Sequence, residues 1–255
     1  MSPATHALGC AVYDLIGRTM RRLARLFAFL TNALFAALVV GAALPGPHRI
    51  LAPTAYSLTE IAPQVWTDAP GRSAELLGLT ETARARVTAF FGDTPPRATL
   101  VLCSTRACAD AFGIGGNGLS VADNLILVSP GGLTLGTLTH EMTHSRLHRS
   151  MGPRNLVRQP YPTWFDEGLA THVADHPRWN GEVTQAHRAR VRQVQRFWQL
   201  GDAFQELGVG RTYRAVAAEV AAIEARAGRA GLLELIARAE QGERFADVLA
   251  EVTAR

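Results

Sequence analysis

The sequence of 255 residues predicts an α+β fold with one N-terminal transmembrane helix. Three observations lead to this prediction. An uncharged apolar run lies near the N-terminus, short runs rich in aliphatic residues lie in the middle of the chain, and the part after residue 167 has helical periodicity almost throughout. We divide the chain into a cytoplasmic segment (residues 1–25), a membrane anchor (26–45) and one folded domain (46–255).

The apolar run at residues 26–44 carries no charge and is just long enough to span a bilayer as a helix. Four arginines between positions 18 and 25 precede it, so we expect the N-terminus in the cytoplasm and everything after Pro45 outside, at a bacterial-type inner membrane. A cleaved signal peptide is the alternative, because residues 41–43 (Gly-Ala-Ala) resemble a cleavage site. The anchor is preferred because the run exceeds the usual signal core.

Composition excludes several function classes. All 26 basic residues are arginine, so the chain has neither a Walker-type phosphate loop nor a Schiff-base lysine. Of the net charge of +4, four arginines and one aspartate place +3 in the first 47 residues. No basic patch with interleaved aromatic residues remains in the domain, so no nucleic-acid partner is predicted.

The elements of the domain follow in order. Residues 52–70 are interpreted as a linker or an irregular lead-in strand, and Ser73 to Phe91 as a helix that ends at a glycine. Residues 98–103 and 124–128 are predicted strands. Cys103 and Cys108 are expected to form a local disulfide, ahead of two buried thiols, whereas Cys10 is expected to be a free thiol in the cytoplasm.

The next predicted helix, Thr134 to Arg149, carries the most informative motif. His140, Glu141 and His144 form an H-E-x-x-H run, and residues four apart lie one above the other on a helix. Two imidazoles can therefore hold one metal ion while the glutamate beside them reaches its bound water. This is the ligand arrangement of a zinc hydrolase, which needs a third protein ligand and an open fourth position.

Glu167 is the candidate third ligand. It lies in the run Pro-Thr-Trp-Phe-Asp-Glu-Gly-Leu-Ala that begins at Pro162. Thr163 and Asp166 have the spacing of a capping box, which predicts a helix with Glu167 in its first turn. A carboxylate there also favours the positive end of the helix dipole.

The rest of the chain is predicted to be helical, in segments separated by glycines. Arg188, Arg190, Arg192 and Arg196 are expected to form a solvated helix face. The predicted helices span residues 182–199, 212–227, 230–239 and 244–254.

The H-E-x-x-H run followed by W-F-D-E-G-L-A resembles the gluzincin metallopeptidases, and most closely the branch with the membrane-alanyl-type aminopeptidases and many bacterial peptidase-like proteins. The match covers about residues 124–174. It implies that His140, His144 and Glu167 bind Zn2+ and that Glu141 is the general base. It also implies a small sheet packed on the active-site helix, whose edge strand holds extended peptide.

That resemblance leaves several roles open. The segment 125–128 is a candidate for the peptide-binding strand, and an ordinary buried strand fits it equally well. Tyr213 resembles the downstream tyrosine of this branch and is the candidate oxyanion stabiliser, with Tyr161 and His187 as alternatives. Thr171 stands where thermolysin-type enzymes have an aspartate, which agrees with the aminopeptidase-like branch. No motif for gripping a substrate amino terminus is present, so the substrate class stays open.

Three further histidines are weighed as ligands. His148 extends the motif by another turn, and we interpret it mainly as a helix-end cation or a surface residue. His172 and His176 follow Glu167 and either support the metal ligands or lie at the surface.

The sequence thus predicts a zinc-dependent peptidase with a peptide or protein substrate. One alternative is a catalytically silent binding module in which zinc braces the fold, and another is a zinc hydrolase with a different substrate. Glu141 favours an enzyme over the silent module, because a structural zinc site has no use for a general base.

Overall fold

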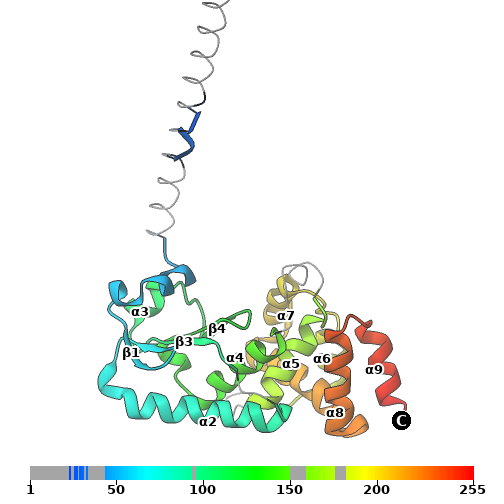
Figure 1. Ribbon diagram of the computed structural model, residues 1–255. Helices are drawn as coiled ribbons and strands as arrows, with labels where there is room; N and C mark the ends of the chain where they lie inside the picture. The colour runs from blue at the N-terminus through cyan, green and yellow to red at the C-terminus, as the bar shows by residue number, and fades with distance from the viewer. Residues whose placement is uncertain are drawn as a thin grey trace, which may run out of the picture. The chain divides into compact units, whose positions relative to one another are not determined.

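The computed structural model describes residues 23, 26, 27, 29–31, 33, 44–93, 96–149, 159–175 and 182–255. The chain divides into two compact units, residues 1–48 and 49–255 (Figure 1). In the first unit, the described residues between 23 and 33 are helical and exposed. The second unit carries the residues predicted to bind metal.

The described residues do not contain the membrane anchor predicted at residues 26–45. Crossing a bilayer takes a continuous helix of about 20 mainly apolar residues. No helix among the described residues is both long enough and apolar enough to do so. The predicted fold class was therefore wrong in including a transmembrane helix. The predicted location, as a single-pass protein of the inner membrane, was wrong for the same reason. Most of residues 26–45, and also Cys10, lie outside the described part of the chain.

The second unit is built on a mixed sheet. Its strands are β1 (Thr59–Ala62), β2 (Val65–Thr67), β3 (Thr99–Leu102), β4 (Gly118–Val121) and β5 (Leu125–Val128). They lie in the order β1-β2-β3-β5-β4, with β2, β3 and β5 parallel and an antiparallel strand at each end. The two predicted strands correspond to β3 and β5. Strands β1 and β2 lie within residues 52–70, which were expected to be a linker or a lead-in strand. Strand β4 was not predicted.

The unit also contains α-helices and short 3-10 helices. The α-helices are α2 (Ser73–Phe91), α3 (Arg106–Ala111), α4 (Leu135–Leu147), α5 (Thr163–Ala174), α6 (Gln185–Val191), α7 (Leu200–Leu207), α8 (Val209–Glu240) and α9 (Phe245–Thr253). Short 3-10 segments are η1 (Pro47–Leu51), η2 (Pro53–Tyr56), η3 (Pro70–Arg72), η4 (Pro130–Gly132) and η6 (Phe197–Gln199).

Both faces of the sheet are buried at β5. In β5, Ile126 packs into the main core that the large helices share, whereas Leu127 packs into a smaller cluster with Phe112 and the residues of α3. All four side chains of β5 are buried. This explains why the strand is a continuous apolar run in the sequence and has no alternation of polar and apolar residues. Cys103 and Cys108, in the same small cluster, form the predicted disulfide.

Helix α4 lies in the middle of the unit. It packs against α2, α5, β4 and β5, which buries all of its residues except Leu135 and Arg146, which are partly buried. Thr134 caps its N-terminus, because the Thr134 hydroxyl accepts a hydrogen bond from the Thr137 amide. The predicted helices at 73–91 and 134–149 are thus both present, the first with the same bounds.

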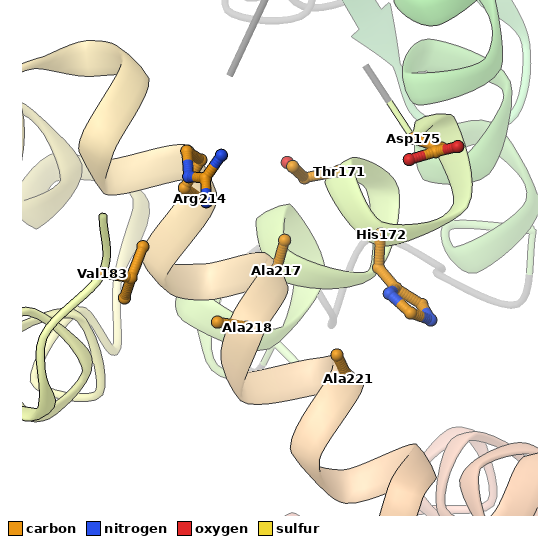
Figure 2. Close-up of a pocket in the computed structure, with 8 residues that line it drawn as sticks. All are labelled: Thr171, His172, Asp175, Val183, Arg214, Ala217, Ala218 and Ala221. Atoms are coloured by element: carbon orange, nitrogen blue, oxygen red, sulfur yellow. The ribbon is translucent and has the colours of Figure 1, made fainter. Parts of the chain in front are cut away.

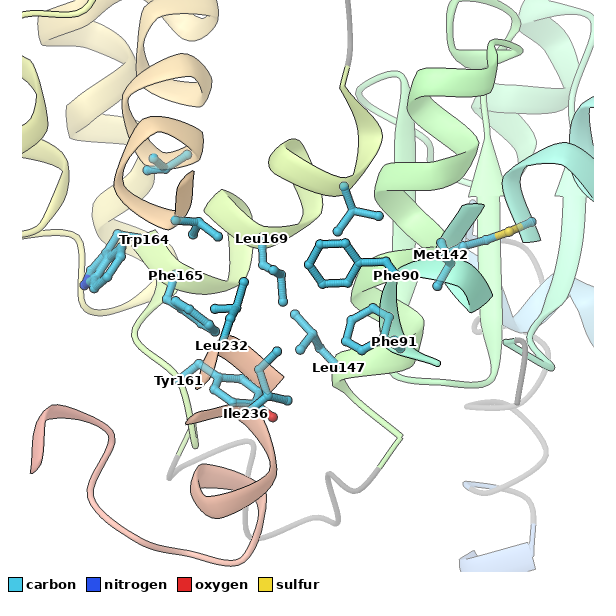
Figure 3. Packing of buried hydrophobic residues seen from close by; sticks show 14 of the residues in the cluster. Phe90, Phe91, Met142, Leu147, Tyr161, Trp164, Phe165, Leu169, Leu232 and Ile236 are labelled. Carbon is cyan, nitrogen blue, oxygen red and sulfur yellow. The ribbon is translucent and has the colours of Figure 1, made fainter. Parts of the chain in front are cut away.

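The main core joins residues of α2, α4 and α5 with residues of α6 to α9. Phe90 and Phe91 of α2, Met142 and Leu147 of α4, the aromatic residues of α5 and two aliphatic residues of α8 meet there (Figure 3). Trp164 and Phe165 of α5 form aromatic contacts with Phe245 of α9, at centroid distances of 5.9 and 4.8 Å. The core therefore fixes α5 between α4 and α8.

Gly168 lets α5 and α8 approach each other. A β-carbon at this position would lie 2.6 Å from the Val216 carbonyl oxygen of α8, closer than any real β-carbon contact. The glycine that follows Glu167 in the W-F-D-E-G run is therefore required by helix packing. This close approach brings the first turns of α8 beside the helix that carries Glu167.

The C-terminal region is helical as predicted, with different boundaries. In the predicted helix 182–199, only α6 and the short η6 are helical. The predicted helices 212–227 and 230–239 both belong to α8, which is interrupted at Gly228, and the predicted helix 244–254 corresponds to α9. The predicted solvated arginine face is also different. Arg188 and Arg192 form ion pairs with Glu219, whose side chain is only 2% exposed, and Arg190 pairs with Glu206. Arg188 and Arg192 thus neutralise the buried Glu219 carboxylate, which would otherwise be costly to bury.

We expect Phe165→Ala to lower the free energy of unfolding by about 3–5 kcal/mol, because it leaves a cavity between three helices. Phe165 is 0% exposed, whereas Phe197 is 66% exposed and provides the matched control. Phe197→Ala should change stability by no more than about 0.5 kcal/mol. Urea denaturation of both variants tests this, and equal losses would contradict the packing described.

Candidate metal centre

Three predicted ligands converge at the interface of α4 and α5. His140 and His144 lie one turn apart on α4, and their Nε2 atoms are 3.0 Å apart. Glu167 enters from α5, with its Oε2 atom 3.4 Å from His140 Nε2 and 3.5 Å from His144 Nε2. All three residues are buried, and their donor atoms form a group able to hold a metal ion.

The distances fit a single zinc ion. Donors arranged tetrahedrally at about 2.0–2.1 Å from zinc lie about 3.3–3.4 Å from one another. The three distances observed, 3.0, 3.4 and 3.5 Å, lie around this value. Two imidazoles and one carboxylate are also a donor set that catalytic zinc sites use, leaving the fourth position open.

Asp166 connects two histidines behind the ligand group. His144 Nδ1 donates to Asp166 Oδ1 at 2.9 Å, and His148 Nε2 donates to Asp166 Oδ2 at 2.8 Å. The first bond leaves the Nε2 lone pair of His144 directed at His140 and Glu167, as metal binding requires. His144, His148 and Asp166 also form a second group with metal-ligand spacing. Both histidines are hydrogen-bonded directly to Asp166, which favours a supporting network there.

This network corrects two interpretations. The predicted capping box of Thr163 and Asp166 is absent, because Pro162 occupies the cap position and no side chain caps α5. The Asp166 carboxylate is turned instead towards α4, where it pairs with histidines. His148, expected to be a helix-end cation or a surface residue, is one of these partners.

The charges in this cluster favour a cation. Burial opposes the charge of Glu167, but His144 and His140 outweigh it and lower the pKa of Glu167 to about 2. Burial likewise opposes the charge of His144, yet Asp166 and Glu167 raise its pKa well above the usual value. Histidines likewise lower the pKa of Asp166 against the effect of burial. In the folded chain the carboxylates of Glu167 and Asp166 thus retain their charge and attract positive charge, either protons or a metal ion.

Glu141 lies beside the ligands without belonging to them. Burial raises its pKa above the usual value, although His140 and His144 act against this shift. The Ser120 amide of β4 donates a hydrogen bond to the Glu141 carboxylate. Gly118 of the same strand makes room for Glu141, since a β-carbon there would lie 2.6 Å from Glu141 Oε1. A raised pKa suits a group that takes up a proton near neutral pH.

Of the candidate oxyanion stabilisers, Tyr213 lies at the site. Its ring packs edge-on against the His140 ring, at a centroid distance of 5.7 Å. Burial, together with the charges of Glu167 and Glu141, raises the pKa of Tyr213 above its usual value. Its phenol therefore stays protonated and able to donate a hydrogen bond.

The two alternatives to Tyr213 have other positions. Tyr161 packs against Phe165 and Phe245 in the main core. The His187 side chain accepts a hydrogen bond from the Thr184 amide and caps α6.

The remaining histidines lie outside the ligand group as far as they are described. His172 Nε2 lies 2.6 Å from Glu224 Oε2, and its ring contacts Phe90. His176 falls outside the described residues.

The edge strand nearest the site is β4. The segment 125–128, a candidate for peptide binding, is strand β5, which is paired on both sides and therefore cannot add a strand. The alternative prediction, that this segment is an ordinary buried strand, is confirmed. Strand β4 lies at the end of the sheet, and it carries both Gly118 and the Ser120 amide that contact Glu141.

Sequence reasoning missed the roles of Asp166, His148 and β4. The first two left a signal, because Asp166 directly precedes the ligand glutamate and His148 lies one turn after His144. Strand β4 left little signal, because it begins at the end of a glycine-rich stretch. Its importance comes from its contact with α4, which no local pattern encodes.

Comparison of the chain with models of protein families, with curated proteins and with solved structures gave no match. The resemblance to gluzincins therefore rests on the sequence motifs alone.

We expect Asp166→Asn to weaken zinc binding about ten- to hundredfold, because the amide cannot replace the charge that orients His144. Competition with a chromogenic chelator measures the dissociation constant. Asp175→Asn is the matched control, because Asp175 lies at the exposed C-terminal end of the same helix. Equal zinc affinity in wild type and Asp166→Asn would show that Asp166 does not support the metal.

Proposed function

We propose that this protein is a zinc-dependent peptidase of gluzincin type that hydrolyses peptide bonds. One observation carries the proposal. The Glu141 carboxylate is buried next to three converging donor atoms and is not one of them. Burying a carboxylate that binds no metal is costly, and general-base catalysis gives a reason for it.

Each group at the site has a role in this proposal. A zinc ion held by His140, His144 and Glu167 supplies Lewis acidity towards a carbonyl oxygen and towards water. Glu141 takes the proton of the attacking water and later delivers it to the leaving amine. Tyr213 donates a hydrogen bond to the carbonyl oxygen as negative charge develops there.

Strand β4 supports a peptide as the substrate. An extended peptide can pair with the free edge of a sheet, where main-chain hydrogen bonds hold it independently of its sequence. Strand β4 is such an edge, and it passes directly beside Glu141. Its side chains Leu119 and Val121 are 40% and 38% exposed, so they are available to a bound chain.

We expect Glu141→Gln to retain zinc and thermal stability but to lose hydrolysis by several powers of ten. Glutamine has the size of glutamate but cannot accept the proton of water. Digestion of a peptide library, followed by mass spectrometry, measures the activity, and elemental analysis measures the zinc. Glu206→Gln, which alters only a surface ion pair with Arg190, is the control.

The outcomes separate the alternatives. Cleavage by Glu141→Gln at the wild-type rate would show that Glu141 is not the base. Loss of zinc or of folding in this variant, with no cleavage by the wild type, would favour the silent module that zinc braces.

A further inference from the structure

A cavity of about 300 Å³ lies between α5 and α8 (Figure 2). Thr171 of α5 and Arg214 of α8 lie at one end of it, and Ala217, Ala218 and Ala221 form a small apolar wall. Its volume suffices for one amino-acid side chain.

Two residues that line this cavity follow residues of the candidate metal centre on the same helices. Thr171 follows Glu167 by one turn of α5, a rise of about 6 Å along the helix axis. Arg214 directly follows Tyr213, whose ring contacts His140. A substrate bound at the metal could therefore place a side chain next to its scissile bond in this cavity.

Two hydrogen-bond donors face each other in the cavity. Figure 2 shows the Thr171 hydroxyl and the Arg214 guanidinium pointing towards one another. Thr171 is only 4% exposed, and its hydroxyl has no hydrogen-bond partner among the described residues. A buried hydroxyl without a partner is costly, and a bound ligand would satisfy it.

Arg214 brings a guanidinium to this end of the cavity. The His172 side chain points away and pairs with Glu224. Asp175, the acidic residue of the lining, lies at the far end from Arg214 (Figure 2). A guanidinium and a hydroxyl together match the two oxygens of a carboxylate, and a charge-assisted hydrogen bond is roughly twice as strong as a neutral one.

We propose that this cavity is a specificity subsite that binds a carboxylate of the substrate next to the scissile bond. The inference rests on the proposed peptidase function. The carboxylate belongs either to an acidic side chain or to the free C-terminus of the peptide. The alanine wall accommodates the short aliphatic stem of glutamate or aspartate, and leaves little polar surface for a longer basic side chain.

The test is digestion of a peptide library that is prepared with free and with amidated C-termini. Wild type, Arg214→Gln and Arg214→Glu are compared, with Arg226→Gln as the control on an exposed position of the same helix. We expect wild type to prefer glutamate over glutamine at one position beside the cut, or free over amidated ends, by roughly ten- to hundredfold.

Arg214→Gln should lose this preference, and Arg226→Gln should keep it. Arg214→Glu should shift the preference towards lysine or arginine, a gain that misfolding does not produce. Cleavage by wild type without any acidic preference, or a preference that survives Arg214→Gln, would overturn the subsite and leave the peptidase proposal intact.

Binding provides a second measurement that does not need turnover. N-acetylglutamate and N-acetylglutamine are titrated calorimetrically into zinc-loaded wild type and Arg214→Gln. Preference of wild type for the acid, lost in the variant, supports the carboxylate site even if no peptide is cleaved. Equal binding of acid and amide, or binding of neither, contradicts it.

Discussion

The burial of the Glu167 carboxylate against two imidazoles is the interaction on which the rest of this structure depends. Carboxylates are costly to bury, and Glu167, Asp166 and Glu141 are all brought into one interface between α4 and α5. His140, His144 and His148 offset part of this cost through hydrogen bonds and charge. A divalent cation would offset more, so binding of metal and stability of the fold are coupled.

The surrounding fold serves this interface. Gly168 allows α8 to approach α5, so that Tyr213 reaches His140, and Gly118 allows β4 to approach Glu141. Arg146, on the outer side of α4, is 2.6 Å from an Asp93 carboxylate oxygen and 3.3 Å from one of Glu240. These contacts link α4 to the end of α2 and to the end of α8. Helix α4 therefore contacts α2, α5, α8, β4 and β5, which limits movement of its histidines.

The sequence allowed prediction of those features that depend on local pattern. Ser73 to Phe91 has helical periodicity and a glycine stop, and its bounds were correct. The convergence of His140, His144 and Glu167 could be predicted because histidines four apart and the W-F-D-E-G run are local signals. The parallel pairing of β3 with β5 and the edge position of β4 depend on contacts between distant segments. The contact of Asp166 with α4 was missed for another reason. An aspartate in a capping box and an aspartate that supports a metal ligand look alike in sequence. The membrane anchor was predicted from one uncharged apolar run and the arginines that precede it, and no described helix is both long enough and apolar enough to cross a bilayer.

Zinc-edge X-ray absorption spectroscopy of the purified full-length protein tests the central claim most directly, because it reports the ligands of the metal. The account predicts one zinc ion per chain bound by two imidazoles and one carboxylate, with one imidazole lost in His140→Ala. A protein that takes up no zinc, or a spectrum that is the same in wild type and His140→Ala, would contradict the assignment of His140, His144 and Glu167 as the metal ligands.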